Sequence, residues 1–259
     1  MKVTVGFLLV LCHLAATRAW TCKEAPRLSS ARQIAAGHGQ VLARSSYNRV
    51  YFLSGTSWYR LGSVSLKDVS VGPSGIWGVD YTNKVYKFIA GEFRPSSGSL
   101  LQQVDAGGNG QVVGVTPSTN LTYCLRSNYA SAFKGVGSLS WTYLGRAMKS
   151  YSCGPLYGCW GVDQSNRLYV SQVSPTTCSS SGWTLVSTSM SMIDVSADGS
   201  VFAVSTSGLV YQRTGISRSR PQGVGWSSVP MCMAITSVSY DLGQLWALTS
   251  SGLLMQCTH

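Results

Sequence analysis

Apolar and polar positions along the chain recur in a pattern that is repeated six times. Each unit has a first strand that ends in a small residue followed by Gly or Asp, then a short turn and a second apolar strand. A polar turn, a third strand and a segment led by an aromatic residue follow. The first strands end at 34–37, 69–72, 104–107, 151–154, 195–198 and 238–241. A period of roughly 35 to 47 residues with several short strands per unit is typical of a β-propeller.

The second and third strands of each unit are apolar or small at both alternating sets of positions. This pattern predicts strands that are covered on both faces, as stacked blades require. Gly stands beside Trp in second strands such as 76–79 and 159–162, which predicts that the backbone of a neighbouring blade approaches there. The Trp residues recur at fixed positions of the repeat, so they are expected in the core rather than under a ligand.

A fourth strand begins at an aromatic residue in the first five units and is missing from the sixth. These residues are Trp58, Phe93, Trp141, Trp183 and Trp226. A similar segment, Trp20-Thr21-Cys22, precedes the first unit instead. We therefore predict an all-β, six-bladed β-propeller of four-stranded repeats over residues 20–259, in which the N-terminal strand completes the last blade. Cys22 and Cys257 would then lie on adjacent strands and close the ring with a disulfide.

Residues 1–19 have the features of a secretory signal peptide rather than of a folded element. Lys2 precedes an apolar run over 3–11, and Thr17-Arg18-Ala19 offers small residues for cleavage. The run is too short to span a bilayer, so a secreted, extracellular protein without membrane insertion is expected.

The other cysteines are expected to be paired in an exported protein. Cys153 and Cys159 flank a short turn and should face each other across a hairpin, while a Cys124–Cys178 bond would tie neighbouring blades. Cys232 is left over, and it is either free or bridges to a second chain, which leaves a homodimer open. No paired Cys-x-x-Cys motif indicates zinc. No cofactor is expected, and the sequence leaves bound calcium open.

The formal net charge of the whole chain is +11. In an exported protein such a balance favours attraction to anionic surfaces, for example bacterial envelopes or acidic glycans. The basic residues are scattered and no nucleic-acid motif accompanies them, so nucleic acid is not an expected partner.

The second unit shows the complete motif, with Val-Ser-Val-Gly at 69–72, Ile-Trp-Gly-Val-Asp at 76–80 and Asn-Lys-Val-Tyr at 83–86. This pattern resembles the tectonin repeat. The length, the signal peptide and the first and last cysteines are similar to those of fish-egg lectins, relatives of the tachylectin type. The resemblance covers nearly all of 20–259 and is strongest in units two and four. It implies a lectin of eggs or innate defence that binds N-acetylglucosamine, galactose-type sugars or bacterial lipopolysaccharide on microbial or egg surfaces.

The turns between second and third strands are the candidate sugar sites. Their carboxylate and amide groups can exchange hydrogen bonds with sugar hydroxyls. The candidate residues are Asn48, Asp80, Asn83, Asp163 and Asn166. The alternative is that Asp and Asn serve their own turns, which they favour. The corresponding turns of units five and six are Ser-Thr-Ser-Gly and Thr-Ser-Ser-Gly, so equivalent sites are not expected there.

Asn120 begins the single N-glycosylation sequon, on the corresponding turn of unit three. An enzyme is not expected, because neither a nucleophile elbow nor the paired carboxylates of a glycosidase accompany the fold pattern. The competing function is a structural or protein-binding propeller of egg coat or body fluid without sugar affinity.

Overall fold

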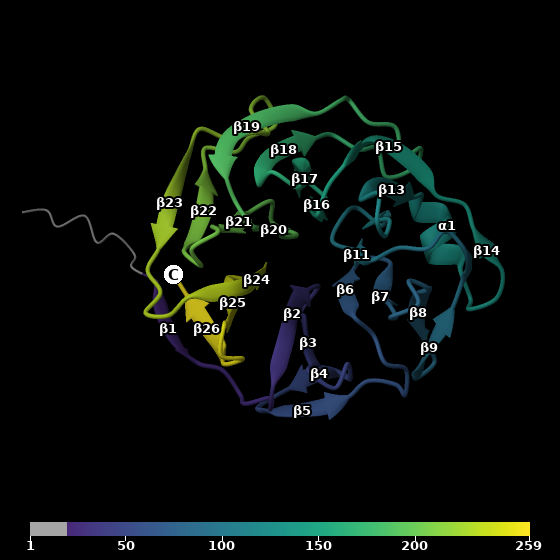
Figure 1. The fold of residues 1–259 in the computed structure, drawn as a ribbon, viewed down its shortest axis with the longest axis horizontal. Coiled ribbons are helices and arrows are strands. Elements are labelled where there is room, and N and C mark those ends of the chain that lie inside the picture. The colour runs from purple at the N-terminus through teal and green to yellow at the C-terminus, as the bar shows by residue number, and fades with distance from the viewer. Residues whose placement is uncertain (1–19) are drawn as a thin grey trace, which may run out of the picture.

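The chain forms a ring of six four-stranded antiparallel sheets around a central axis (Figure 1). This computed structural model describes residues 20–259, and the predicted signal peptide over 1–19 lies outside the described residues. Each sheet is one blade, with its first strand at the axis and its fourth at the rim. The predicted six-bladed β-propeller is confirmed.

Consecutive strands build blades one to five, and only blade six takes a strand from elsewhere in the chain. Blade one contains β2 (Ala31–Gly37), β3 (Gln40–Ser45), β4 (Val50–Ser54) and β5 (Ser57–Arg60), and blade two contains β6 (Asp68–Gly72), β7 (Gly75–Val79), β8 (Val85–Ile89) and β9 (Glu92–Pro95). Blade three contains β11 (Gln103–Asp105), β12 (Val112–Val115), β13 (Leu121–Leu125) and β15 (Thr142–Ala147), and blade four contains β16 (Ser150–Gly154), β17 (Gly158–Val162), β18 (Arg167–Ser171) and β19 (Thr184–Ser189). Blade five contains β20 (Met192–Val195), β21 (Val201–Val204), β22 (Val210–Thr214) and β23 (Gly225–Val229), and blade six contains β24 (Ile235–Asp241), β25 (Gln244–Thr249), β26 (Leu254–Thr258) and β1 (Thr21–Glu24).

The N-terminal strand closes the ring as predicted. β1 pairs antiparallel with β26, and Cys22 lies opposite Cys257 in their register and is bonded to it. Figure 1 shows β1 beside β26 at this blade, close to the C-terminus. Because β1 and β26 belong to the same sheet, backbone hydrogen bonds close the ring and leave no open seam at blade six.

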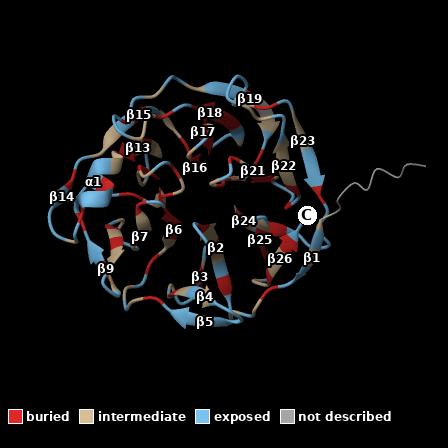
Figure 2. Cartoon of the chain, turned by 180° about the vertical axis from the view of Figure 1, so that it is seen from behind, coloured by how far each residue is buried: buried red, intermediate tan, exposed pale blue. Residues whose placement is uncertain are grey.

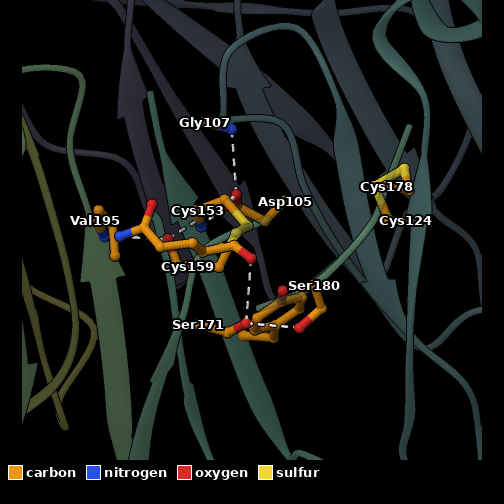
Figure 3. The surroundings of a disulfide bond; sticks show 12 residues. Asp105, Gly107, Cys124, Cys153, Cys159, Ser171, Cys178, Ser180 and Val195 are labelled. Carbon is orange, nitrogen blue, oxygen red and sulfur yellow. Dashed lines mark hydrogen bonds between the residues drawn. A yellow bond between two sulfur atoms is a disulfide. The ribbon is translucent and has the colours of Figure 1, made fainter. Parts of the chain in front are cut away.

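The other two predicted disulfides are also present. Cys153 and Cys159 face each other in the register of β16 and β17, and Cys124 on β13 is bonded to Cys178 in the loop after β18. Figure 3 shows both bonds. Cys232 is exposed and unpaired among the described residues.

Blade three carries an insertion that the repeat pattern does not predict. The loop between β13 and β15 contains the short helix α1 (Ser127–Ala132), and β14 (Ser138–Leu139) pairs in parallel with β10 (Ser97–Gly98) after blade two. Lys87 of blade two donates from Nζ to the Ala130 carbonyl at 2.6 Å. Because Lys87 is buried, it fixes the helix to the neighbouring blade.

The core lies between adjacent blades. Exposed residues gather at the rim of the ring, as Figure 2 shows for β5 and β23. The second strands β12, β17 and β21 are buried at every position, so the prediction of double coverage is correct for them. Among the third strands it is wrong for β4, where buried or half-buried positions alternate with exposed ones, but it is correct for β18 after the first residue of that strand. Trp77, Trp160 and Trp246 are buried, as expected.

The glycine that lets neighbouring blades approach is not the one that the sequence indicated, so this prediction is wrong. Gly78 was expected to admit a neighbouring blade's backbone, but a Cβ there would lie 2.5 Å from Cδ1 of Leu66, in the segment leading into the same blade. The close approach occurs at the end of the first strand instead. A Cβ at Gly72 would lie 1.7 Å from the carbonyl oxygen of Ala106 in blade three.

Side chains of the first strands join successive blades around the axis. In five blades, one residue of this strand accepts a hydrogen bond from a backbone N–H of the next blade. These bonds are Ala106 to Ser70 at 2.9 Å, Cys153 to Asp105 at 3.0 Å, Val195 to Ser152 at 3.0 Å, Tyr240 to Asp194 at 3.0 Å and Ala36 to Ser239 at 2.9 Å. Figure 3 shows Asp105 beside Cys153 within this series. In blade one the equivalent residue is Ala35, whose side chain cannot accept a hydrogen bond. Gln33 contacts blade two instead: its amide donates to the Val69 carbonyl and accepts from the Val69 N–H.

Candidate functional site

The turns between second and third strands share one local design. In blades two and four the first residue is an aspartate whose carboxylate binds backbone N–H groups of its own turn. Asp80 Oδ1 accepts from Thr82 at 2.8 Å and from Lys84 at 2.9 Å. Asp163 Oδ1 accepts from Ser165 and Arg167, both at 2.9 Å.

These bonds also set the acidity of both groups. Burial alone would raise the pKa of Asp80, but hydrogen bonds from the turn outweigh it and hold the pKa below its usual value. For Asp163, burial is likewise outweighed by the bonds from Arg167 and Ser165, so its pKa is also lowered. Both carboxylates are therefore ionised acceptors committed to turn donors.

In blades five and six, hydroxyl oxygens accept the equivalent hydrogen bonds from the backbone of the turn. Ser205 accepts from the backbone N–H of Leu209 at 3.1 Å, and Thr249 accepts from that of Leu253 at 2.9 Å. Since the bond recurs in blades that were not expected to bind sugar, the geometry agrees with the turn-forming alternative for Asp80 and Asp163. Direct contact of these two aspartates with sugar stays a prediction.

The three asparagines stand at the other end of these turns. Asn48, Asn83 and Asn166 have φ of 61°, 68° and 64°, in the left-handed region that Asn and Gly tolerate best. Their backbone carbonyls accept hydrogen bonds from the segment that enters the next blade; for example, Leu101 N–H donates to the Asn83 carbonyl at 2.8 Å. Hydrogen bonds therefore hold the backbone of the turn on both sides, and they fix the direction in which the asparagine side chain leaves it.

Each of these asparagines accepts from a basic side chain near the axis. Lys67 donates to Asn83 Oδ1, Lys149 to Asn166 Oδ1, and Arg44 to Asn48 Oδ1 at 3.2 Å. We call these three contacts the cation–amide pairs. Because a cation only donates, the amide oxygen must face it and the NH2 group is turned away. Among residues 20–259 no hydrogen-bond acceptor is found for these three NH2 groups.

The other three blades lack such a pair. In blade three Gln102 donates to Asn120 Oδ1 at 2.6 Å, so the partner of the sequon asparagine is neutral. In blades five and six, Gly208 and Gly252 hold the left-handed position with φ of 81° and 87°. The structure thus groups blades one, two and four, the same blades that contain the predicted asparagines.

Two exposed tyrosines adjoin the pair of blade one, and the sequence reasoning missed them. Tyr47 is 72% exposed, and Tyr81 of blade two is 60% exposed and donates its hydroxyl to Asn48 Oδ1 at 2.7 Å. The signal in the sequence was a Tyr beside the Asn or Asp of a polar turn, where burial gives no reason for an aromatic residue. Their ring faces offer apolar surface beside polar groups, which suits the mixed surface of a sugar.

The axial channel opens beside the cation–amide pairs. It has a cavity of about 300 Å³ that all six first strands line, together with β3. Four basic residues line it, and we call them the axial basic cluster: Arg32, Arg44, Lys67 and Lys149. No member of this cluster is among the ion pairs found within 20–259.

Three half-buried aspartates, Asp68, Asp105 and Asp194, line the same cavity. Burial raises the pKa of Asp68 to about 6, and burial raises that of Asp105 to about 7 and of Asp194 to about 8, with mutual repulsion adding to the last two. Within the described part of the chain no group of three His, Cys, Asp or Glu residues has an arrangement that could hold a metal ion. The same residues contain no helix long and apolar enough to cross a membrane.

A family model, the tectonin domain, matches residues 30–250. The chain belongs to the tectonin domain family. It is also 39% identical over 158 residues to the Fish-egg lectin of Cyprinus carpio, a match that spans 60% of this chain and 65% of the carp protein. The tectonin resemblance read from the repeats is confirmed, while the match to the carp protein spans slightly less than two thirds of that protein's length.

Solved structures of low sequence identity share the propeller fold. A gluconolactonase from Xanthomonas campestris has a TM-score of 0.64 at 10% identity, over 90% of this chain and 87% of that one. The Cps50 (Swd1) β-propeller domain of Myceliophteria thermophila has a TM-score of 0.60 at 9% identity, over 93% and 99% of the two chains. These similarities concern the fold alone.

Proposed function

We propose that this tectonin protein is a non-catalytic lectin whose sugar sites are the cation–amide pairs of blades one, two and four. The observation that carries the proposal is the repetition of the same arrangement in these three blades. In each, a basic side chain holds the oxygen of an asparagine amide and leaves the NH2 group free. The similarity to the carp Fish-egg lectin supports the same conclusion.

Each pair would supply complementary donors to a sugar. The free NH2 groups of Asn83 and Asn166 donate to hydroxyl or acetamido oxygens, and the remaining N–H donors of the neighbouring lysine reach a second oxygen. Asp80 and Asp163 fix the turns that aim the amides. At blade one the rings of Tyr47 and Tyr81 add an apolar face for the sugar's C–H groups.

Single sites of this kind are weak. Each hydroxyl exchanges bonds to water for bonds to protein, so a shallow polar site has little net affinity. Three sites on one rigid ring raise the affinity for a surface that repeats the same sugar. We therefore propose multivalent binding to N-acetylglucosamine, galactose-type sugars or lipopolysaccharide on microbial or egg surfaces. The three disulfides support a secreted protein.

A glycan array with competition by free sugars tests the proposal. The lectin should bind a defined subset of immobilised glycans, and millimolar free sugar should release it. The competing function, a structural or protein-binding propeller, predicts no glycan signal above background.

Two variants locate the binding. Asn83→Gly and Asn166→Gly remove the amide while keeping the left-handed turn, because Gly208 and Gly252 occupy the same position in blades five and six. Each should weaken its site about threefold to tenfold, the value of one or two hydrogen bonds. Asn109→Gly, an exposed asparagine on the turn after β11, is the matched control and should bind as the parent does. Equal binding by all three variants would place the sugar elsewhere.

A further inference from the structure

The axial basic cluster is a concentration of positive charge that the neutral-sugar sites do not require. Arg32, Lys67 and Lys149 come from the starts of three different blades, and Arg44 comes from the strand beside the first. A fold stabilised by apolar contacts between blades gains nothing from converging cations, which repel one another. Their convergence on one cavity therefore points to an opposite charge brought by a ligand.

The partners of these cations are neutral. Lys67, Lys149 and Arg44 donate to asparagine amides, which orient the cations without cancelling their charge. In addition, Arg44 Nε is buried and has no hydrogen-bond partner in the structure described over 20–259.

The carboxyl groups in the channel only partly offset this charge. Asp68 lies close enough to Arg44 and Lys67 for their charges to act on it, and it is bonded to Gln33 and to the N–H of Val104. Burial keeps Asp194 largely protonated near pH 7, with a pKa of about 8. Four cations therefore face fewer than three negative charges in this cavity, and the net charge of its lining is positive.

We propose that the axial basic cluster is an oxyanion site that binds a carboxylate, sulfate or phosphate group carried by a glycan. The inference rests on the proposed lectin function. The cluster adjoins the cation–amide pairs through three shared side chains, so a sugar seated at a pair can direct an acidic substituent toward the axis. A cavity of about 300 Å³ is large enough for such a group. Charge-assisted bonds from several cations would then favour acidic over neutral forms of the same sugar.

Calorimetry at low ionic strength tests this with three probes: N-acetylglucosamine, N-acetylglucosamine 6-sulfate and inorganic sulfate. The parent protein should bind the sulfated sugar at least about tenfold more tightly than the neutral one, as expected for a charge-assisted bond. The preference should shrink in high salt, which screens the cluster. Inorganic sulfate should bind more weakly than the sulfated sugar, and equal affinity would overturn the assignment to a glycan.

Charge variants distinguish a local site from overall charge. In Lys67→Gln/Lys149→Gln, the ratio of sulfated to neutral affinity should fall toward one. The control Lys23→Gln/Lys134→Gln removes the same charge from exposed lysines outside the cavity and should keep the parental ratio. The variant Lys67→Arg/Lys149→Arg should also keep it, and melting curves confirm that each variant is folded.

The outcomes separate this inference from the proposed function. An equal loss of preference in the Gln variant and its control would overturn the oxyanion site, and so would a parental ratio near one with normal neutral-sugar binding. Binding of neither sugar by the folded parent would overturn both proposals. Binding of the sulfated sugar alone would support the oxyanion site and overturn the neutral-sugar sites.

Discussion

Replacing Asp163 by Ala should destabilise the protein more than it weakens sugar binding. The substitution removes two bonds from backbone N–H groups at 2.9 Å and one from Arg167 Nε at 2.7 Å. Asp163 is only 7% exposed, so water replaces these bonds incompletely. The Arg167 side chain is 59% exposed, and its ion pair therefore adds at most about 1 kcal/mol.

The two backbone bonds dominate the effect. Each is worth roughly 1 kcal/mol or slightly more, so the expected loss is about 2–3 kcal/mol. For a domain of this size that corresponds to a decrease of about 4–12 °C in melting temperature. The variant Asp163→Thr should recover part of the loss, because Thr249 makes the equivalent bond in blade six.

Thermal unfolding and sugar titration on the same preparations decide between the two roles of Asp163. The turn role predicts a lower melting temperature and unchanged sugar affinity per folded molecule. The lowered pKa of Asp163 further predicts that its contribution is present above the ordinary pKa of about 4 and is lost as the pH falls through its lower folded-state pKa. An unchanged melting temperature with loss of sugar binding would refute this reasoning and support direct contact.

Three further predictions concern the contacts between blades. Gly72→Ala should lower the free energy of unfolding by more than about 3 kcal/mol or prevent folding, because its Cβ would lie 1.7 Å from a backbone oxygen. Gly225→Ala is the control: the nearest atom to its Cβ is 3.2 Å away, so its effect in the same urea titration should be mild. Lys87→Met should lower the free energy of unfolding by about 1–3 kcal/mol, since the Ala130 carbonyl loses its donor; no change in urea unfolding would contradict the role of this contact. Asp194→Asn should flatten the pH dependence of stability, because the raised pKa of about 8 stabilises the parent at low pH. This contribution is lost at about 1.4 kcal/mol per pH unit between the ordinary value of 3.8 and about 8. The variant should therefore gain on the parent as the pH rises to 8, and parallel stability curves would contradict the assignment.

The architecture could be predicted from the sequence because each unit repeats the same pattern of apolar and polar positions. The displaced Trp20-Thr21-Cys22 segment was enough to predict ring closure, since an incomplete last unit needs a fourth strand. The register of Cys22 and Cys257 then followed. The insertion with α1 was not predictable, because it occurs once and has no counterpart in the other blades.

The candidate site was predicted less completely. Asn83 and Asn166 stood out by their spacing, but a sequence alone does not show which amide atom faces a neighbour. Lys67 and Lys149 were missed because their partners lie 16 and 17 residues away and meet them only in the folded blade. The axial basic cluster could not be predicted for the same reason, because its four residues are far apart in the sequence and come together only in the closed ring.

The most direct test of the lectin account is a crystal of the protein soaked with N-acetylglucosamine. If the cation–amide pairs bind sugar, density should appear beside Asn48, Asn83 and Asn166, with the amide NH2 groups donating to sugar oxygens. The turns of blades five and six should be empty. Density that avoids all three asparagines, in a crystal where their turns are open to solvent, would contradict it.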